Sequence, residues 1–238
     1  MSRIIHDCEQ NSPEWHTARC GLLTASVAHV PFLAGKSKDK ESTQRRDLRT
    51  QLALERIVGV SCAAEFSNSD TERGKALEAE ALAAYEARTG VLLSRVGFVS
   101  RDDLPIGCSP DGAVLVRGRV VADEAGTIYG PADDAFDGGV DAKCPRPANH
   151  LAYLRDPASL VAAYEAQIRH TLWITGAPWW DLASFCPQFP PASRLLVMRI
   201  DARGVDLAAH ELVVRQFLRE VDAEAAEIRR MSDGKEAA

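Results

Sequence analysis

Two short runs about thirty residues apart carry the side chains with the clearest chemical potential. The first places Asp111 in a Ser-Pro-Asp-Gly turn, and the second places Asp141 and Lys143 two residues apart. A hard cation such as Mg²⁺ takes oxygen ligands, and two carboxylates with the main-chain carbonyl of Ala142 can hold it while leaving sites for water and phosphate. This pattern is typical of a metal-dependent phosphodiesterase in which the lysine acts on the attacking water.

The spacing of these residues predicts how a strand would present them. Successive side chains on a strand alternate between faces, so Asp141 and Lys143 point the same way. The turn at Asp111 opens a strand over 113–116, which could pair with 139–143 and bring the two carboxylates together. Each motif alone is more often an ordinary turn or an ordinary exposed strand, and only their order and combination indicate a site.

Five blocks occur in a fixed order along the chain: Asn11 to Ser26, Arg73 to Glu78, Ser109 to Gly112, Asp141 to Pro145 and Tyr164 to Trp173. In these blocks the sequence resembles the lambda-type exonuclease (YqaJ-like viral recombinase) family, within the PD-(D/E)xK nucleases, over roughly residues 11 to 222. It departs from the family pattern at Asp141, where glutamate is usual. The acidic, glycine-containing stretch 118–139 is also longer than the usual hairpin.

The resemblance implies a fold and an activity. The fold would be α/β with a restriction-endonuclease-like core, in which helices flank a mixed central β-sheet. The activity would be Mg²⁺-dependent digestion of linear double-stranded DNA, with Mn²⁺ as a substitute, from the 5′ end. The resemblance further implies a ring-shaped homotrimer that cooperates with a single-strand annealing protein in viral recombination, in the cytoplasm of a bacterial host.

A second set of residues is predicted to bind the 5′-phosphate of the cut strand. A helix beginning at Thr24 to Ser26 would offer free N–H groups and hydroxyls, which suit a phosphate. The guanidinium of Arg19 could add bidentate hydrogen bonds. From the residues alone, a capping role for Ser26 and a surface ion pair for Arg19 are favoured. The resemblance reverses this preference, since it places Arg19 and Ser26 at phosphate-binding positions.

Three helical residues complete the predicted site. Glu78 shares a helix face with apolar residues three, four and seven positions later, so its carboxylate could point inward. Taken alone, Gln167 is a helix-surface amide and Tyr164 a half-buried aromatic residue. The resemblance implies that Glu78 lies beside the metal, as a ligand or through water. It also implies that Gln167 binds a metal-bound water and that Tyr164 supports the site.

Composition favours a globular intracellular protein. The 238 residues, 46% of them hydrophobic, predict a single nuclease domain over 1–238, with a core over about 11–222, an insertion loop over about 118–139 and a C-terminal tail over about 232–238. No apolar run reaches the length of a membrane span and no signal pattern opens the chain. Six cysteines without C-x-x-C spacing indicate neither a zinc site nor a disulfide framework.

The net charge of −6 argues against a general nucleic-acid coat protein but not against a nuclease, which gathers carboxylates around its metal. Residues 36–56 hold seven basic side chains against four acidic ones. This stretch is either a contact region for the DNA backbone or a solvated helix face, and the sequence leaves both open.

The expected elements follow from hydrophobic periodicity and capping signals. Helices are predicted over 12–20, 44–58, 70–89, 157–175 and 214–228, with a further helix capped at 24–26, and strands over 91–100, 113–121, 139–143, 179–186 and 194–201. His150 and His170 are interpreted as structural residues rather than general bases. Trp173, Trp179 and Trp180 are interpreted as core and strand residues.

Three alternatives remain open. An endonuclease or a single-strand-specific nuclease would use the same core, and cutting of closed circular DNA would reveal the endonuclease. A catalytically inactive DNA-end-binding subunit would have lost an acid or the lysine, and all three residues are present. A small-molecule metallohydrolase would be favoured by histidine ligands at helical spacing, which the sequence lacks.

Overall fold

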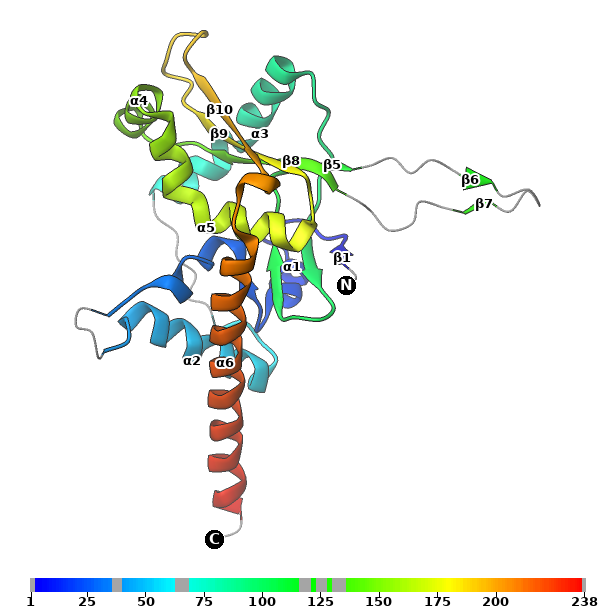
Figure 1. Ribbon diagram of the computed structural model, residues 1–238, viewed down its shortest axis with the longest axis vertical. Coiled ribbons are helices and arrows are strands. Elements are labelled where there is room, and N and C mark those ends of the chain that lie inside the picture. The colour runs from blue at the N-terminus through cyan, green and yellow to red at the C-terminus, as the bar shows by residue number, and fades with distance from the viewer. Residues whose placement is uncertain are drawn as a thin grey trace.

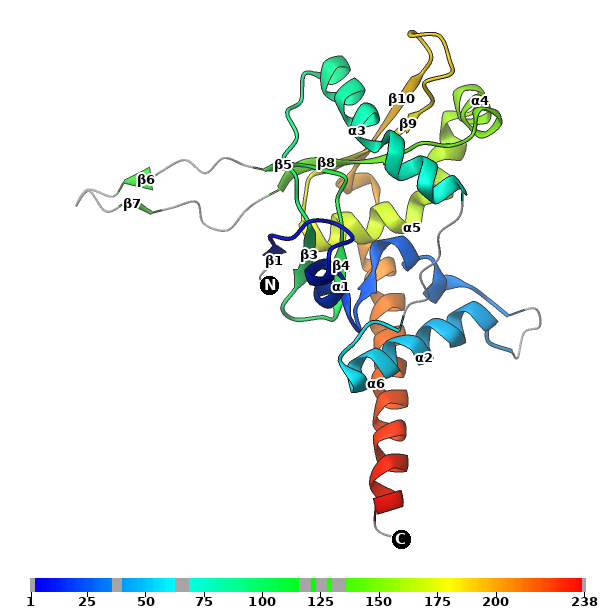
Figure 2. The ribbon, with the colours of Figure 1, turned by 180° about the vertical axis from the view of Figure 1, so that it is seen from behind.

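The computed structural model describes the backbone of residues 3–35, 40–62, 69–115, 121–122, 128–129 and 136–236. The fold combines two four-stranded mixed sheets with helices (Figures 1 and 2). The predicted α/β class is therefore confirmed, but the single central sheet is replaced by two sheets. None of the helices in this part of the chain has the length and hydrophobicity to cross a membrane.

The first sheet has the strand order β10-β9-β8-β5. Its strands are β5 (Gly112–Leu115), β8 (Phe136–Lys143), β9 (Trp179–Phe185) and β10 (Leu195–Asp201). The predicted pairing of the two motif strands is confirmed, because β5 lies antiparallel to β8 with Gly112 opposite Val140. β8 in turn runs parallel to β9, and β9 antiparallel to β10.

The second sheet has the order β1-β3-β4-β2. It contains β1 (Arg3–His6), β2 (Leu23–Thr24), β3 (Phe98–Arg101) and β4 (Ile106–Cys108). The strand predicted over 91–100 begins only at Phe98, and Ser94 contributes an isolated bridge to Ala113. A small antiparallel pair, β6 (Val121–Ala122) and β7 (Ile128–Tyr129), lies in the predicted insertion; residues 116–120, 123–127 and 130–135 are outside the described part.

Six helices accompany the sheets in the described chain: α1 (Pro13–Arg19), α2 (Thr43–Val58), α3 (Ser69–Thr89), α4 (Pro147–Arg155), α5 (Pro157–Thr175) and α6 (Leu207–Glu236). The helix expected to begin at Thr24 to Ser26 is only a 3-10 turn, η1 (Ala25–Val27). Two further 3-10 turns are η2 (Val30–Phe32) and η3 (Ala202–Gly204). The expected tail from residue 232 continues α6 as far as Glu236.

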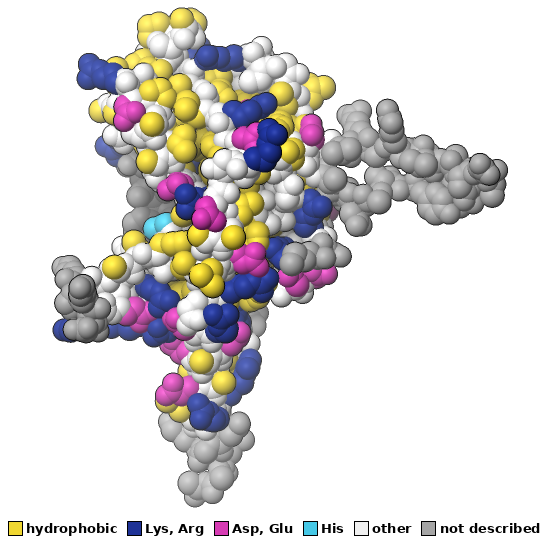
Figure 3. All heavy atoms as spheres, in the orientation of Figure 1, with side chains coloured by type: hydrophobic (Ala, Val, Ile, Leu, Met, Phe, Trp, Pro, Cys, Tyr) yellow, Lys and Arg dark blue, Asp and Glu magenta, His cyan; other side chains and the backbone are white. Residues whose placement is uncertain are grey.

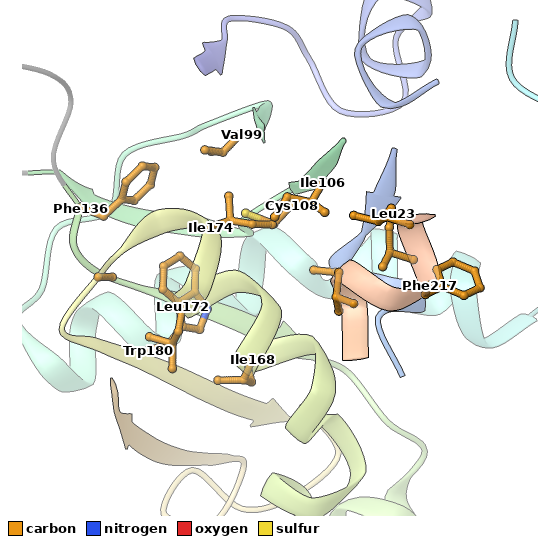
Figure 4. Close-up of a cluster of buried hydrophobic side chains, with 14 of the residues drawn as sticks. Leu23, Val99, Ile106, Cys108, Phe136, Ile168, Leu172, Ile174, Trp180 and Phe217 are labelled. Atoms are coloured by element: carbon orange, nitrogen blue, oxygen red, sulfur yellow. The ribbon is translucent and has the colours of Figure 1, made fainter. Parts of the chain in front are cut away.

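Helix α5 connects the two sheets. It contacts β3 and β4 of one sheet and β9 and β10 of the other. Its residues Ile168, Leu172 and Ile174 are buried in a cluster that also contains Trp180 of β9 and Ile106 of β4 (Figure 4). Because this cluster is continuous, the strand that carries Asp141 and the strand that leads to Asp111 share one packed core.

The basic stretch before and within α2 pairs with α6 rather than remaining free. Three of its arginines form ion pairs of 2.6–2.7 Å with acids on α6: Arg45 with Glu220, Arg49 with Glu224 and Arg56 with Asp222. Basic and acidic side chains accordingly intermingle over α2 and α6 (Figure 3). These three arginines therefore join the two helices, while Lys36 and Lys38 lie outside the described residues.

Candidate active site

The two predicted carboxylates meet where β5 begins beside β8. The backbone N–H of Ala142 donates a hydrogen bond of 2.8 Å to Oδ2 of Asp111, so the Asp111 carboxylate lies against the strand that carries Asp141. The neighbouring Gly112 suits the close pairing of the two strands, since a Cβ there would lie 3.1 Å from Cγ1 of its partner Val140 on β8. The expected juxtaposition of the two motifs is thus present in the fold.

Asp141 is almost fully buried, with 2% of its surface exposed. Gln167 of α5 donates to its Oδ1 at 3.0 Å, and the indole Nε1 of Trp180 donates to its Oδ2 at 2.9 Å. A buried carboxylate is costly unless hydrogen bonds compensate its charge, and these two donors supply that compensation. They also fix the orientation of the carboxylate plane.

Lys143 lies beside Asp141, with its Nζ 3.8 Å from Oδ1. The ammonium group also lies 5.0 Å from the centre of the Tyr164 ring, a cation–π distance. Burial alone would lower the pKa of Lys143. The carboxylates of Asp141 and Asp111 raise it by a larger amount, so the net shift is upward. The amine is therefore protonated at neutral pH and suits an orienting, charge-stabilising role better than that of a free base.

The pKa values of both carboxylates are raised. Burial and the neighbouring Asp141 raise the pKa of Asp111 to about 7, although Lys143 and the N–H of Ala142 oppose the shift. The pKa of Asp141 is also raised, chiefly by burial, against the opposing effects of Lys143, Trp180 and Gln167. One ammonium group does not balance two buried carboxylates, so the site is suited to binding a cation.

The residues fit a hard divalent cation in the number and type of their donors. The described residues contain no cluster of three or more histidine, cysteine, aspartate or glutamate side chains suited to a metal ion, so a cation bound here would have at most two carboxylate side chains as ligands. Protein oxygen ligands would therefore come from Asp111, Asp141 and the main chain near Ala142. Mg²⁺ is commonly held by one or two carboxylates while it keeps several waters, which suits this small set.

Glu78 of α3 lies near this pair but faces another partner. Its Oε1 is 3.4 Å from Nη1 of Arg95, and its side chain is 31% exposed. Its charge nevertheless contributes to the raised pKa of Asp111. Glu78 lines a cavity of about 650 Å³ together with Lys75, Arg95 and Pro110, beside the Asp111 turn. That Glu78 lies beside a bound metal remains a prediction.

Two smaller cavities share the Tyr164 side chain. One, of about 320 Å³, is lined by Ala142, Lys143 and Tyr164. The other, of about 270 Å³, is lined by Ser26, Tyr164 and Gln167. Because Gln167 also holds Asp141, the second cavity connects a residue predicted to bind phosphate with a residue that orients a predicted metal ligand.

The remaining phosphate-binding candidates lie around the end of β4. Thr24 of β2 pairs with Gly107 of β4, and its Oγ1 lies 3.2 Å from Oγ of the exposed Ser26. Arg19 approaches the Oγ of Ser109 at 3.5 Å. Burial lowers the pKa of Arg19 to about 10, against the opposing charge of Glu55.

The surface ion pair favoured for Arg19 from the residues alone is wrong, since its guanidinium forms no ion pair with any residue that the structure describes. The capping role favoured for Ser26 is also wrong, because Ser26 lies inside the short turn η1 and not at its N-cap.

Two tryptophans with direct contacts to the site were not predicted. Trp180 was interpreted as a core residue, yet its indole donates to Asp141. Trp15 donates through Nε1 to Ser109 at 2.9 Å and stacks under Arg19. For Trp180 the sequence offered only the predicted strand over 179–186. Its contact with Asp141 also requires this strand to lie next to β8. For Trp15 the signal was its position four residues before Arg19, which places both on one face of α1.

His150 and His170, both predicted to be structural, are buried and hydrogen-bonded. His150 is buried between Oγ of Ser184 at 2.8 Å and the carbonyl oxygen of Ser193 at 2.9 Å. His170 lies 2.9 Å from His210 and 3.1 Å from the carbonyl oxygen of Leu23. All six cysteines are free.

The fold is shared with solved exonuclease structures. An alkaline exonuclease (LHK-Exo) from Laribacter hongkongensis matches with a TM-score of 0.73 and 24% identity over 94% of this chain and 99% of that chain. The same enzyme in complex with dAMP matches with a TM-score of 0.75 and 25% identity over the same shares. A phage-related exonuclease from Haemophilus somnus 129PT matches with a TM-score of 0.63 and 15% identity, over 87% of this chain and 96% of that chain.

The sequence itself defines the family more closely than the fold does. The profile of the YqaJ-like viral recombinase domain matches residues 14–178, which include Asp111, Asp141 and Lys143. The chain therefore belongs to the YqaJ-like viral recombinase family. The comparison with curated proteins gives no match.

Proposed function

We propose that the chain is a metal-dependent deoxyribonuclease that hydrolyses linear double-stranded DNA from its 5′ end. The observation that carries the proposal is the meeting of Asp111 and Asp141 across β5 and β8, with the Lys143 amine 3.8 Å from Asp141. Family membership and the exonuclease neighbours support the reaction class. The site would use PD-(D/E)xK chemistry within a single domain.

Asp111, Asp141 and the carbonyl of Ala142 would hold Mg²⁺, with Mn²⁺ as a substitute. The ion, when bound, lowers the pKa of a coordinated water and neutralises charge that develops on the phosphate. Gln167 and Trp180 keep the Asp141 carboxylate oriented. Lys143, which stays protonated beside the two carboxylates, orients the water and stabilises the developing negative charge.

The 5′ preference is proposed from the second group of residues. Arg19 is a half-buried cation without an ion pair in the described chain, and a phosphate would give it the anion it lacks. Ser26 lines a cavity with Gln167, so a terminal phosphate held by Arg19, Thr24 and Ser26 would lie on the side of the site occupied by α5. A DNA end held there would enter the metal site in one direction.

The test is incubation of 5′-phosphorylated linear duplex DNA with protein and Mg²⁺. We expect release of nucleotides from the 5′ end by the wild type and loss of at least about 100-fold in rate for Asp111→Asn and for Lys143→Met, by analogy with removal of one transition-state donor. Asp181→Asn is a matched control, because Asp181 is a buried carboxylate on β9 that bonds Arg199 and Tyr85 instead.

The outcomes of this experiment separate the alternatives. Equal activity of the wild type and both site variants would contradict the proposal. Cleavage of closed circular DNA would support the endonuclease alternative, and binding of DNA ends without hydrolysis would support the inactive subunit. The proposed cellular setting is a bacterial cytoplasm.

The proposed assembly is a homotrimeric ring that works with a single-strand annealing protein. Mass measurement in solution tests the trimer. Co-purification with the annealing protein of the same recombination system tests the partner.

A further inference from the structure

The guanidinium of Arg19 lies near two aromatic rings. Its Cζ is 3.7 Å from the centre of the Trp15 ring and 6.0 Å from that of Phe98. Trp15 also donates from Nε1 to Oγ of Ser109 at 2.9 Å, and Arg19 approaches the same oxygen at 3.5 Å. The indole thus contacts both the arginine and the turn that leads to Asp111.

Stacking on Trp15 restrains the Arg19 side chain, which has no ion pair among the described residues. A long arginine side chain with no ion pair would sample several orientations, yet bidentate binding of a phosphate requires the guanidinium plane to point in one direction. Stacking on an indole fixes the plane and leaves the edge N–H groups free for hydrogen bonds. Trp15 itself is held by α1, where its backbone N–H donates to the Ser12 cap at 3.2 Å.

We propose that Trp15 is a positioning residue for end recognition, which acts through Arg19 and Ser109. The indole sets the plane of the Arg19 guanidinium and, through Ser109, ties it to the turn that carries Asp111 two residues later. The distance between the bound 5′-phosphate and the metal-binding carboxylates would then be set by this contact. The inference rests on the proposed function, because it assigns the 5′-phosphate to Arg19.

The test compares kcat/KM on 5′-phosphorylated and 5′-hydroxyl duplex ends, and its readout is the ratio of the two. Trp15→Leu removes both ring and donor, and we expect the ratio to fall by about 2- to 30-fold, the range of a cation–π contact. Trp15→Phe keeps a ring but loses the bond to Ser109, and we expect a fall of about 2-fold or more. In an Arg19→Ala background, neither substitution should change the ratio further.

A matched control lies elsewhere in the same chain. Trp179 stacks on Arg199 at the same 3.7 Å, and its ring packs against Gly138 of β8. Trp179→Leu should therefore leave the preference for phosphorylated ends unchanged. Thermal unfolding of each variant identifies any that fails to fold, and Trp15→Phe then decides the question if Trp15→Leu does not fold.

The inference and the proposed function can fail separately. If the wild type shows no preference for phosphorylated ends, the proposed role of Arg19 is wrong and the inference falls with it. If the wild type shows the preference and both folded Trp15 variants keep the same ratio, only the inference is overturned. The same holds if Trp15→Leu lowers the ratio equally with and without Arg19.

Discussion

The hydrogen bond from Trp180 to Asp141 provides a sharp test of how the site holds its metal. The indole Nε1 lies 2.9 Å from Oδ2 of a carboxylate that is 2% exposed. Trp180→Phe removes this donor and keeps an aromatic ring in the core. A hydrogen bond to a charged group contributes about 1.5–3 kcal/mol, which corresponds to about 10- to 150-fold in an equilibrium constant.

We therefore expect the Mg²⁺ concentration for half-maximal activity to rise by about 10- to 100-fold in Trp180→Phe, the range typical of outer-shell partners of metal ligands. Titration of activity against Mg²⁺ measures this shift, and calorimetric titration with Mn²⁺ measures binding directly. The substitution should lower the free energy of unfolding by less than the about 3–5 kcal/mol of a full truncation to alanine.

Trp179→Phe is the matched control for this prediction. The two tryptophans each pack against a glycine of β8: a Cβ on Gly138 would lie 2.2 Å from the Trp179 ring, and one on Gly139 would lie 2.3 Å from the Trp180 ring. Of these two indoles, that of Trp180 donates a hydrogen bond to Asp141. Equal Mg²⁺ dependence in the two variants would refute the reasoning, because loss of ring volume alone would then explain the result.

Three further predictions concern the same core. Gln167→Leu removes the other donor to Asp141 and should weaken the apparent affinity for Mg²⁺ by about 10-fold in the same titration; an unchanged affinity would show that this bond is dispensable. Burial lowers the pKa of His170 to about 3 and of His210 to about 4. Below pH 6.5 these histidines are protonated in the unfolded chain but stay neutral in the folded chain, so they lower the free energy of unfolding as pH decreases. Each histidine should lower the free energy of unfolding by about 2 kcal/mol between pH 8 and pH 5, while the raised pKa of Asp111 acts in the opposite direction. By urea unfolding, His210→Gln should therefore lose about 2 kcal/mol less than the wild type over this pH range, and an equal loss in the two proteins would contradict this. Arg199→Leu should lower the free energy of unfolding by about 2–3 kcal/mol, less than for a fully buried pair because its side chain is 52% exposed, with nuclease activity retained; loss of activity in the folded variant would place Arg199 in the site.

The sequence predicted the local parts of the site because they depend on short-range rules. Strand alternation correctly placed Asp141 and Lys143 together, and the turn at Asp111 correctly predicted the pairing of β5 with β8. Helix α5 was correctly bounded by its proline start and its glycine end. Strand alternation, the turn and the helix ends each depend on a few neighbouring residues, whereas the pairing of β5 with β8 joins two separate segments.

The parts that were missed depend on contacts between distant segments. Trp180 reaches Asp141 only because β9 lies parallel to β8, which no local pattern specifies. Arg45 pairs with Glu220 only because α2 lies on α6, so the positive charge of Arg45 does not by itself identify its partner. Thr24 belongs to β2 through its pairing with Gly107 of β4, a long-range contact that local capping signals do not predict.

Anomalous scattering from crystals grown with Mn²⁺ tests the central claim most directly. We predict an anomalous peak for a Mn²⁺ ion bound by the carboxylate oxygens of both Asp111 and Asp141, beside the Lys143 amine. This peak should be lost in Asp141→Asn. An active enzyme whose Mn²⁺ peak lies away from these two carboxylates would contradict the account.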